Sequence, residues 1–202
     1  MAALTAPTVA VFAPLGLAPL LGLSALAALV VLWRQGGLDA LRPGAPGLMM
    51  AAVFAWAVAS LIWSTDRPVS LDKLPGLAGL FAGGMLVLGA AKAMDDGERG
   101  VFGRLLVTGI VAALVLLLVE WLGDGPVRRL AGQTFDNEAA RGVSYNRGVT
   151  ALALAVWPAA MLARRRGRLW ALGLLVLTLA VFAVQSSGSA VVGLLIGMAA
   201  FA

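Results

Sequence analysis

Long apolar runs alternate with short polar connectors along the whole chain. Each run is long enough, or nearly long enough, to cross about 30 Å of hydrocarbon as a helix. The pattern predicts an all-α fold, a polytopic transmembrane helical bundle with about seven spans. The expected spans cover residues 9–33, 48–63, 74–94, 101–122, 148–163, 169–184 and 189–202.

The two ends of this pattern carry further expectations. Pro14 and Pro19 interrupt the first run, and proline removes a backbone hydrogen bond, so this run is either one kinked span or a hairpin of two short helices. The last run reaches residue 202 without a polar segment after it. We therefore expect residues 1–202 to form a single transmembrane helical domain, the N-terminal portion of a longer protein.

Composition favours lipid over an aqueous core as the solvent of this chain. Hydrophobic residues make up 61% of it and charged residues only 12%, against about 25% charged residues in soluble domains. The absence of cysteine excludes disulfides and thiolate metal sites, and the absence of histidine removes the commonest near-neutral proton shuttle. No metal-ligand cluster, Gly-rich phosphate loop or Ser nucleophile motif occurs, so we expect no cofactor and no metal.

The positive charges predict which side of the membrane each connector faces. Of the 15 Lys and Arg residues, nine lie in one alternate set of connectors and six in the other. The short, purely positive connector RRRGR (164–168) belongs to the larger set, which positive-inside reasoning places in the cytoplasm. We interpret the net charge of +5 as this orientation signal and expect no nucleic-acid partner. The predicted location is the bacterial inner membrane, with multiple passes.

The connector between residues 123 and 147 holds four arginines on the face where the orientation rule does not favour them: Arg128, Arg129, Arg141 and Arg147. One interpretation is a solvated loop with scattered charges. The other is a site for an anionic group such as a pyrophosphate, because guanidinium binds phosphate oxygens bidentately and keeps its charge. Nearby, Glu120 ends a long apolar run. It is either an ordinary helix-end charge or a functional group near membrane depth.

Three motifs, in order and at plausible spacing, resemble the O-antigen ligase and O-antigen polymerase family, from about residue 9 to the end of the chain. The first is ASLIWSTDRPVSLDKLPGLAGL, with its matching residues Leu61, Trp63, Ser64, Asp66, Ser70 and Leu71. The second leads from a loop into an apolar helix and matches at Gly132, Asn137, Asn146, Arg147, Gly148 and Pro158. The third is the small-residue and serine turn VQSSGSAVVGLLIG.

This resemblance implies a multi-span, GT-C-like glycosyltransferase in surface polysaccharide or lipopolysaccharide biosynthesis. Such enzymes take a glycan from an undecaprenyl diphosphate donor at the periplasmic face and pass it to lipid A–core, to another glycan repeat unit or to a protein. They use no nucleotide sugar, and periplasmic arginines hold the diphosphate. The chain departs from the family pattern at Ser187, which no arginine follows, and the family's reactive-site histidine would lie beyond residue 202.

The expected site residues follow from this chemistry. Cations fixed near a low-dielectric surface stabilise the charge that builds on a departing diphosphate. We predict catalytic roles for Arg147 and Arg141, with Gly142 and Gly148 leaving room for close approach. The expected substrate-binding residues are Arg128, Arg129, Asn137, Tyr145, Asn146 and Glu120.

Two other classes of function stay open. A transporter or channel for a small anion would show inverted repeats and charge at the membrane midplane, and neither is evident in the sequence. A non-catalytic membrane subunit is compatible with the same hydropathy pattern. If the chain is a glycosyltransferase, the predicted partners are a lipid-linked glycan donor, a glycan or lipid A–core acceptor, and membrane lipid.

Overall fold

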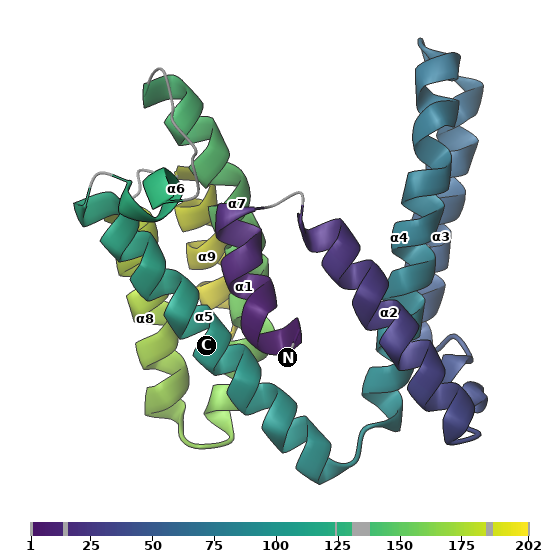
Figure 1. The fold of residues 1–202 in the computed structure, drawn as a ribbon, viewed down its shortest axis with the longest axis horizontal. Helices are drawn as coiled ribbons and strands as arrows, with labels where there is room; N and C mark the ends of the chain where they lie inside the picture. Colours follow the sequence, from purple (N-terminus) through teal and green to yellow (C-terminus); the bar gives the residue numbers. More distant parts are fainter. Residues whose placement is uncertain (1, 14–15, 124, 131–137, 185–187, 202) are drawn as a thin grey trace. The chain divides into compact units, whose positions relative to one another are not determined.

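The computed structural model describes residues 2–13, 16–123, 125–130, 138–184 and 188–201; for residues 128, 130, 138–147, 200 and 201 it describes the backbone only. This part of the chain is helical and contains no strand (Figure 1). The longer helices are α1 (Ala2–Phe12), α2 (Leu17–Arg34), α3 (Ala45–Ala59), α4 (Arg67–Ala93), α5 (Asp96–Leu122), α7 (Glu138–Arg164), α8 (Arg168–Val184) and α9 (Gly188–Phe201). Three short elements complete the fold: η2 (Leu38–Leu41), η3 (Ser60–Ile62) and α6 (Pro126–Leu130).

The prediction of an all-helical membrane protein is confirmed in two respects: the described residues form helices, and several of these helices are long and apolar enough to cross a membrane. Four candidate spans are found in the described ranges: Leu17–Arg34, Ala45–Ile62, Arg67–Ala93 and Asp96–Leu122. Four shorter apolar helices accompany them, at Ala2–Phe12, Gly148–Arg164, Arg168–Val184 and Gly188–Ala199. The expected number of about seven spans is therefore not confirmed.

Two helix boundaries differ from those that hydropathy predicted. The first apolar run is two helices, because α1 ends at Phe12 and α2 begins at Leu17, on either side of Pro14. The prediction that the connector extends to residue 147 is wrong, because α7 already begins at Glu138. Hydropathy marks the residues that avoid water, whereas the sequence EAAR at the start of α7 consists of good helix formers, with an acidic residue suited to the first turn.

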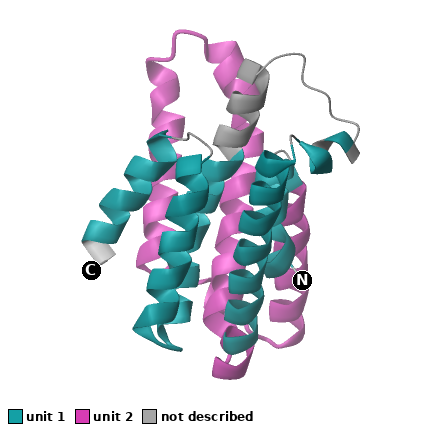
Figure 2. Cartoon of the chain, turned by 90° about the vertical axis from the view of Figure 1, so that its left-hand side faces the viewer, with its two compact units in different colours: residues 1–17, 100–202 teal, residues 18–99 magenta. Residues whose placement is uncertain are grey.

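The helices form two compact units, residues 1–17 with 100–202 and residues 18–99 (Figure 2). Unit 1 therefore contains α1, most of α5, and α6 to α9, and unit 2 contains α2, α3 and α4. The expected single domain over residues 1–202 stays a prediction.

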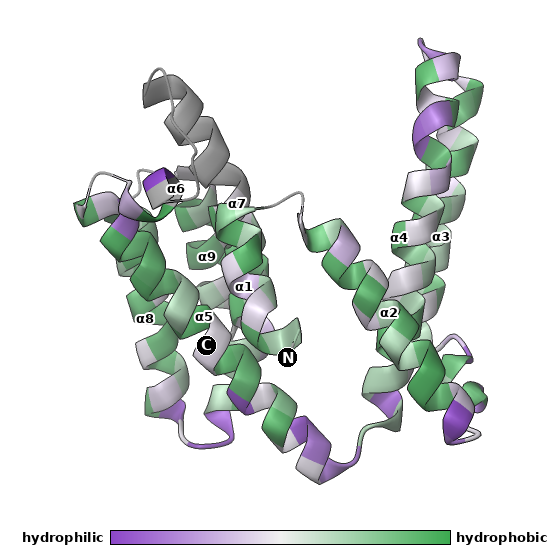
Figure 3. Cartoon of the chain, in the orientation of Figure 1, coloured by the Kyte–Doolittle hydropathy of each residue, from purple (hydrophilic) through white to green (hydrophobic). Residues whose placement is uncertain are grey.

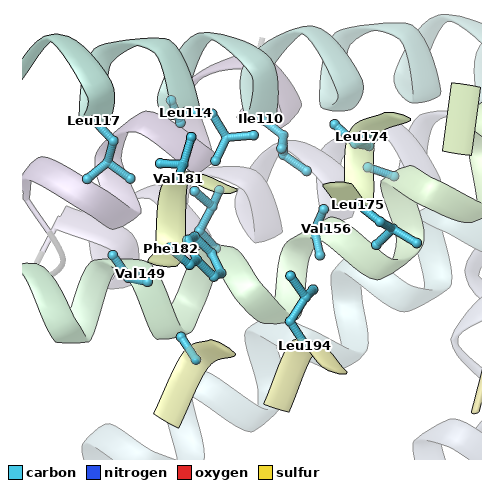
Figure 4. Close-up of a cluster of buried hydrophobic side chains, with 14 of the residues drawn as sticks. Ile110, Leu114, Leu117, Val149, Val156, Leu174, Leu175, Val181, Phe182 and Leu194 are labelled. Carbon is cyan, nitrogen blue, oxygen red and sulfur yellow. The ribbon is translucent and has the colours of Figure 1, made fainter. Parts of the chain in front are cut away.

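Unit 1 is organised around one apolar cluster to which five helices contribute (Figure 4). Phe182 of α8 is fully buried at its centre, between Leu117 of α5 and Val149 of α7. Val11 of α1 and Leu194 of α9 complete the cluster, both with no exposed surface. The core thus joins the beginning of the chain to its last third.

Glycines let α1 lie against two other helices of unit 1. A Cβ on Gly148 of α7 would lie only 2.6 Å from Val11 Cα. On α5, a Cβ on Gly109 would clash with the carbonyl oxygen of Leu4. Real Cβ atoms do not approach so closely, so both positions require glycine, as small residues allow close helix contact in membrane proteins. These contacts fix α1 within unit 1.

Unit 2 is much more open. Its α3 and α4 run side by side (Figure 1). Yet only 6% of the residues in the candidate span Ala45–Ile62 are buried, and only 11% of those in the apolar 18-residue window of Arg67–Ala93. Small residues make the contacts, as where Gly83 of α4 meets Leu21 and Ala25 of α2. The exposed apolar side chains of this unit suit contact with lipid tails, which are as apolar as leucine.

Candidate functional site

Charged residues lie at two opposite ends of unit 1. At one end, Gly103 of α5 packs on Leu162 of α7, where a Cβ on the glycine would lie 3.3 Å from the leucine side chain. Arg104 and the α7–α8 turn of residues 164–168 therefore share this end, which is strongly hydrophilic in Figure 3. At the other end, α5 finishes near Glu120 and leads into α6. The two helices α5 and α7 are thus antiparallel, with arginines at both ends.

Glu120 is the best-defined of the predicted site residues. Only 1% of its surface is exposed, and its Oε2 accepts a hydrogen bond of 2.7 Å from the backbone nitrogen of Val127. The chain returns to it through a turn in which Gly125, with a φ of +89°, donates from its nitrogen to the Glu120 carbonyl oxygen at 2.8 Å. A left-handed φ of this kind favours glycine. Glu120 thus joins the end of α5 to the start of α6.

This contact distinguishes Glu120 from its neighbour. Trp121 is 51% exposed, so the two residues do not share a face of α5. Adjacent helical residues point about 100° apart. Glu120 therefore acts in the fold as an internal acceptor, and its predicted role in binding substrate stays a prediction.

The short helix α6 carries the first arginine pair. Its sequence PVRRL places Arg128 and Arg129 directly after the Glu120 contact. The Arg129 side chain is exposed and its backbone nitrogen donates to the Gly125 carbonyl oxygen at 3.0 Å. For Arg128 the structure describes the backbone. Proline at the first helical position and the preceding turn glycine were signals in the sequence that would have predicted this element.

The remaining predicted residues lie in or before α7. Arg141, Tyr145, Asn146 and Arg147 are in the first part of this helix, ahead of the buried pair Gly148 and Val149. They are not in a loop, as the sequence had suggested, and their side chains lie outside the described part of the structure. Asn137 lies outside the described residues altogether. The structure thus places the backbone segments that carry these arginines at one end of unit 1.

The motif of Trp63 to Leu71 forms the corner between α3 and α4 in unit 2. Asp66 caps α4 by accepting from the Val69 nitrogen at 3.3 Å, and Arg67 Nη2 donates to the Ile62 carbonyl oxygen at 2.7 Å. The Ser64 and Ser70 hydroxyls are 2.8 Å apart. These contacts explain the spacing of the motif, because each polar side chain satisfies a neighbouring group at the corner.

Tryptophans stand at the ends of several helices. Trp33 is 73% exposed in the last turn of α2, Trp63 58% exposed after η3, and Trp170 69% exposed in the first turn of α8. Amphipathic rings in such places suit the level of lipid headgroups.

Neither chemistry nor similarity adds a further assignment. Within the described residues, no group of three or more His, Cys, Asp or Glu side chains could hold a metal ion. Comparison with protein-family models, with curated proteins and with solved structures finds no match for this chain.

Proposed function

We propose that this chain takes part in lipid-linked glycan transfer at the periplasmic face of the bacterial inner membrane, as an O-antigen ligase or polymerase type of enzyme in surface polysaccharide biosynthesis. The donor would be a glycan on undecaprenyl diphosphate, and the acceptor lipid A–core or another glycan. One observation carries the proposal. The end of α5, the short helix α6 and the first part of α7, which together carry Arg128, Arg129, Arg141 and Arg147, lie at the end of unit 1 opposite the RRRGR turn.

The chemistry needs cations at the membrane surface. As a glycosidic bond to a lipid diphosphate breaks, negative charge builds on the leaving diphosphate. Fixed guanidinium groups lower the energy of that charge because they need no reorganisation at the moment of reaction. Helical placement of Arg141 and Arg147 in α7 supports this role, because a helix holds side-chain positions better than a loop does.

The buried Glu120 contact also supports this proposal. By accepting from Val127, its carboxylate holds α6 against the end of α5, and α6 carries Arg128 and Arg129. The lipid tail of a donor would lie along the apolar helices while its diphosphate meets this end. The resemblance in the motifs around Trp63 and Arg147 gives the reaction class.

The test begins with deletion of the gene that encodes this chain. We expect loss of long-chain surface glycan on a gel and accumulation of glycan linked to undecaprenyl diphosphate. Complementation with the Arg147→Ala variant should reduce long-chain glycan about a hundredfold, the usual effect of removing one preorganised charge-stabilising group. Arg147→Lys should restore part of it, because the charge is kept without the planar fork.

Arg42→Ala is the matched control, because Arg42 is an exposed arginine paired with Asp39, far along the chain from the proposed site. It should rescue fully. If Arg147→Ala and Arg141→Ala both rescue as well as the wild type, the site assignment is wrong while the function stands. If deletion leaves surface glycan and lipid-linked intermediates unchanged, the function itself is wrong.

A further inference from the structure

The turn between α7 and α8 concentrates exposed arginines in a few consecutive residues. Three exposed basic side chains in other parts of the chain pair with aspartates: Arg42 with Asp39 at 3.1 Å, Arg99 with Asp96 at 3.2 Å and Lys73 with Asp72 at 3.8 Å. In the α7–α8 turn, Arg165, Arg166 and Arg168 are exposed and form no ion pair within the described part of the chain. No acidic residue follows Glu138 in the sequence.

The turn is built so that its charges stay together. The Arg165 nitrogen donates to the Leu162 carbonyl oxygen at 3.2 Å, and the Arg166 nitrogen donates to the Ala163 carbonyl oxygen at 2.9 Å. Gly167, with a φ of +148°, then lets α8 begin at once with Arg168. Three exposed arginines therefore lie within the four consecutive residues 165–168, and Arg104 of α5 lies at the same end.

Apolar side chains continue directly from this charge. Leu169 is 83% exposed and Trp170 is 69% exposed, and the Trp170 ring lies by the turn, its Cδ1 3.6 Å from where a Cβ on Gly167 would be. Figure 3 shows the hydrophilic turn passing into the apolar helix α8. A free phosphate ion would use only the arginines, whereas a phospholipid would use the arginines for its headgroup and the leucine and tryptophan for its interfacial region.

We propose that the α7–α8 turn is a binding site for the phosphate group of an anionic phospholipid. Arg165, Arg166 and Arg168 bind the phosphodiester oxygens and the surface charge of the lipid layer, since arginine matches phosphate geometry bidentately. Leu169 and Trp170 lie among the upper acyl carbons. The site is at the opposite end of unit 1 from the proposed glycan-transfer site, and it does not depend on that function.

The experiment uses the purified chain in neutral detergent, titrated with phosphatidylglycerol or phosphatidylcholine, with binding followed by native mass spectrometry. We expect phosphatidylglycerol to bind more tightly than phosphatidylcholine. The triple variant Arg165→Gln, Arg166→Gln, Arg168→Gln should lose about a hundredfold of that affinity, since each basic residue near an anionic surface contributes about fivefold. The corresponding triple lysine variant should recover most of the binding, because it keeps the charge.

The matched control removes the same amount of charge from the paired residues, as Arg42→Gln, Lys73→Gln, Arg99→Gln. It should bind phosphatidylglycerol within about threefold of the wild type, because these residues already have aspartate partners. Circular dichroism verifies that both variants are helical. Equal loss in both triple variants would show a response to net charge alone and overturn the site. Competition by millimolar inorganic phosphate, equal to that by the lipid, would overturn its assignment to phospholipid.

Discussion

Unit 1 and unit 2 solve the problem of assembling apolar helices in different ways. In unit 1, helices far apart in sequence share one buried cluster, with Phe182 and Leu114 almost without exposed surface. In unit 2, six residues are buried, all of them small except Leu32: Ala25, Ala28, Leu32, Gly47, Gly83 and Gly89. Many of its large apolar side chains are exposed, among them Leu23, Met49 and Trp56. Unit 1 is held by a side-chain core and by the close backbone approach of α1, and unit 2 by contacts of its small residues with neighbouring side chains and by polar contacts at helix ends.

This difference matters because lipid supplies no hydrophobic force between helices. A buried side chain stabilises a membrane helix bundle through the fit of its contacts, and its loss leaves a cavity. An outward-facing apolar side chain contacts lipid in either case. Substitutions of similar chemistry should therefore have unequal effects in the two units.

The largest difference is expected at Phe182. Phe182→Ala should lower the free energy of unfolding by about 3 kcal/mol, because the cavity lies at the centre of the unit 1 cluster. The matched change in unit 2 is Met49→Ala, at a side chain that is 72% exposed, and it should cost less than about 0.5 kcal/mol. Thermal unfolding of the purified chain in detergent measures both. Similar losses at the two positions would contradict the comparison.

The chain offers a local probe for the same experiment. It has no cysteine, so a single Ala159→Cys substitution at a fully buried position of unit 1 reports the opening of that unit by its rate of thiol labelling. Phe182→Ala should speed this labelling, and Met49→Ala should leave it unchanged.

A smaller effect is expected from glycine replacement. Gly148→Ala should destabilise the protein by about 1–3 kcal/mol, because its methyl group would meet the backbone of Val11. Gly79→Ala in α4 has nothing within 4 Å of its new methyl group and should stabilise the helix by up to about 1 kcal/mol. Chemical denaturation in detergent compares the two variants. If Gly148→Ala proves neutral, α1 does not lie against α7 as described.

The smallest effect is expected at the α3–α4 corner. Asp66→Ala removes the cap of α4 and should cost about 1 kcal/mol. Asp66→Asn keeps an oxygen acceptor and should cost only a few tenths of that. Thermal unfolding distinguishes them, and a loss at Asp66→Asn as large as at Asp66→Ala would show that the charge, not the cap, matters.

The sequence predicted the helices best where burial in lipid and helix formation coincide. The expected span 169–184 agrees with α8 (Arg168–Val184), and the expected span 101–122 ends with α5 at Leu122. It failed at Glu138, because helix formation there continues through polar residues that hydropathy excludes. It also could not assign Ala2–Phe12 to a helix of its own, since the break near Pro14 was compatible with a kink.

The candidate site was predictable only in part. Charge patterning identified the arginines and their position opposite RRRGR, since both follow from sequence order. The burial of Glu120 was not predictable, because it arises from the turn at Gly125 that returns the Val127 nitrogen to its carboxylate. Contacts of this kind depend on local three-dimensional geometry and leave no periodic pattern in the sequence.

Unit 1 is formed from two separate stretches of sequence, residues 1–17 and 100–202, so its first helix is synthesised long before the helices that it contacts. At 11 residues, α1 is about 16 Å long, too short to cross a bilayer by itself, and its partner Gly148 is made more than a hundred residues later. At about 5–20 residues per second, α1 waits on the order of ten seconds or more for α7. Unit 2 (residues 18–99) is synthesised during that interval. Its three helices are therefore complete before α1 can pack against α7 in unit 1.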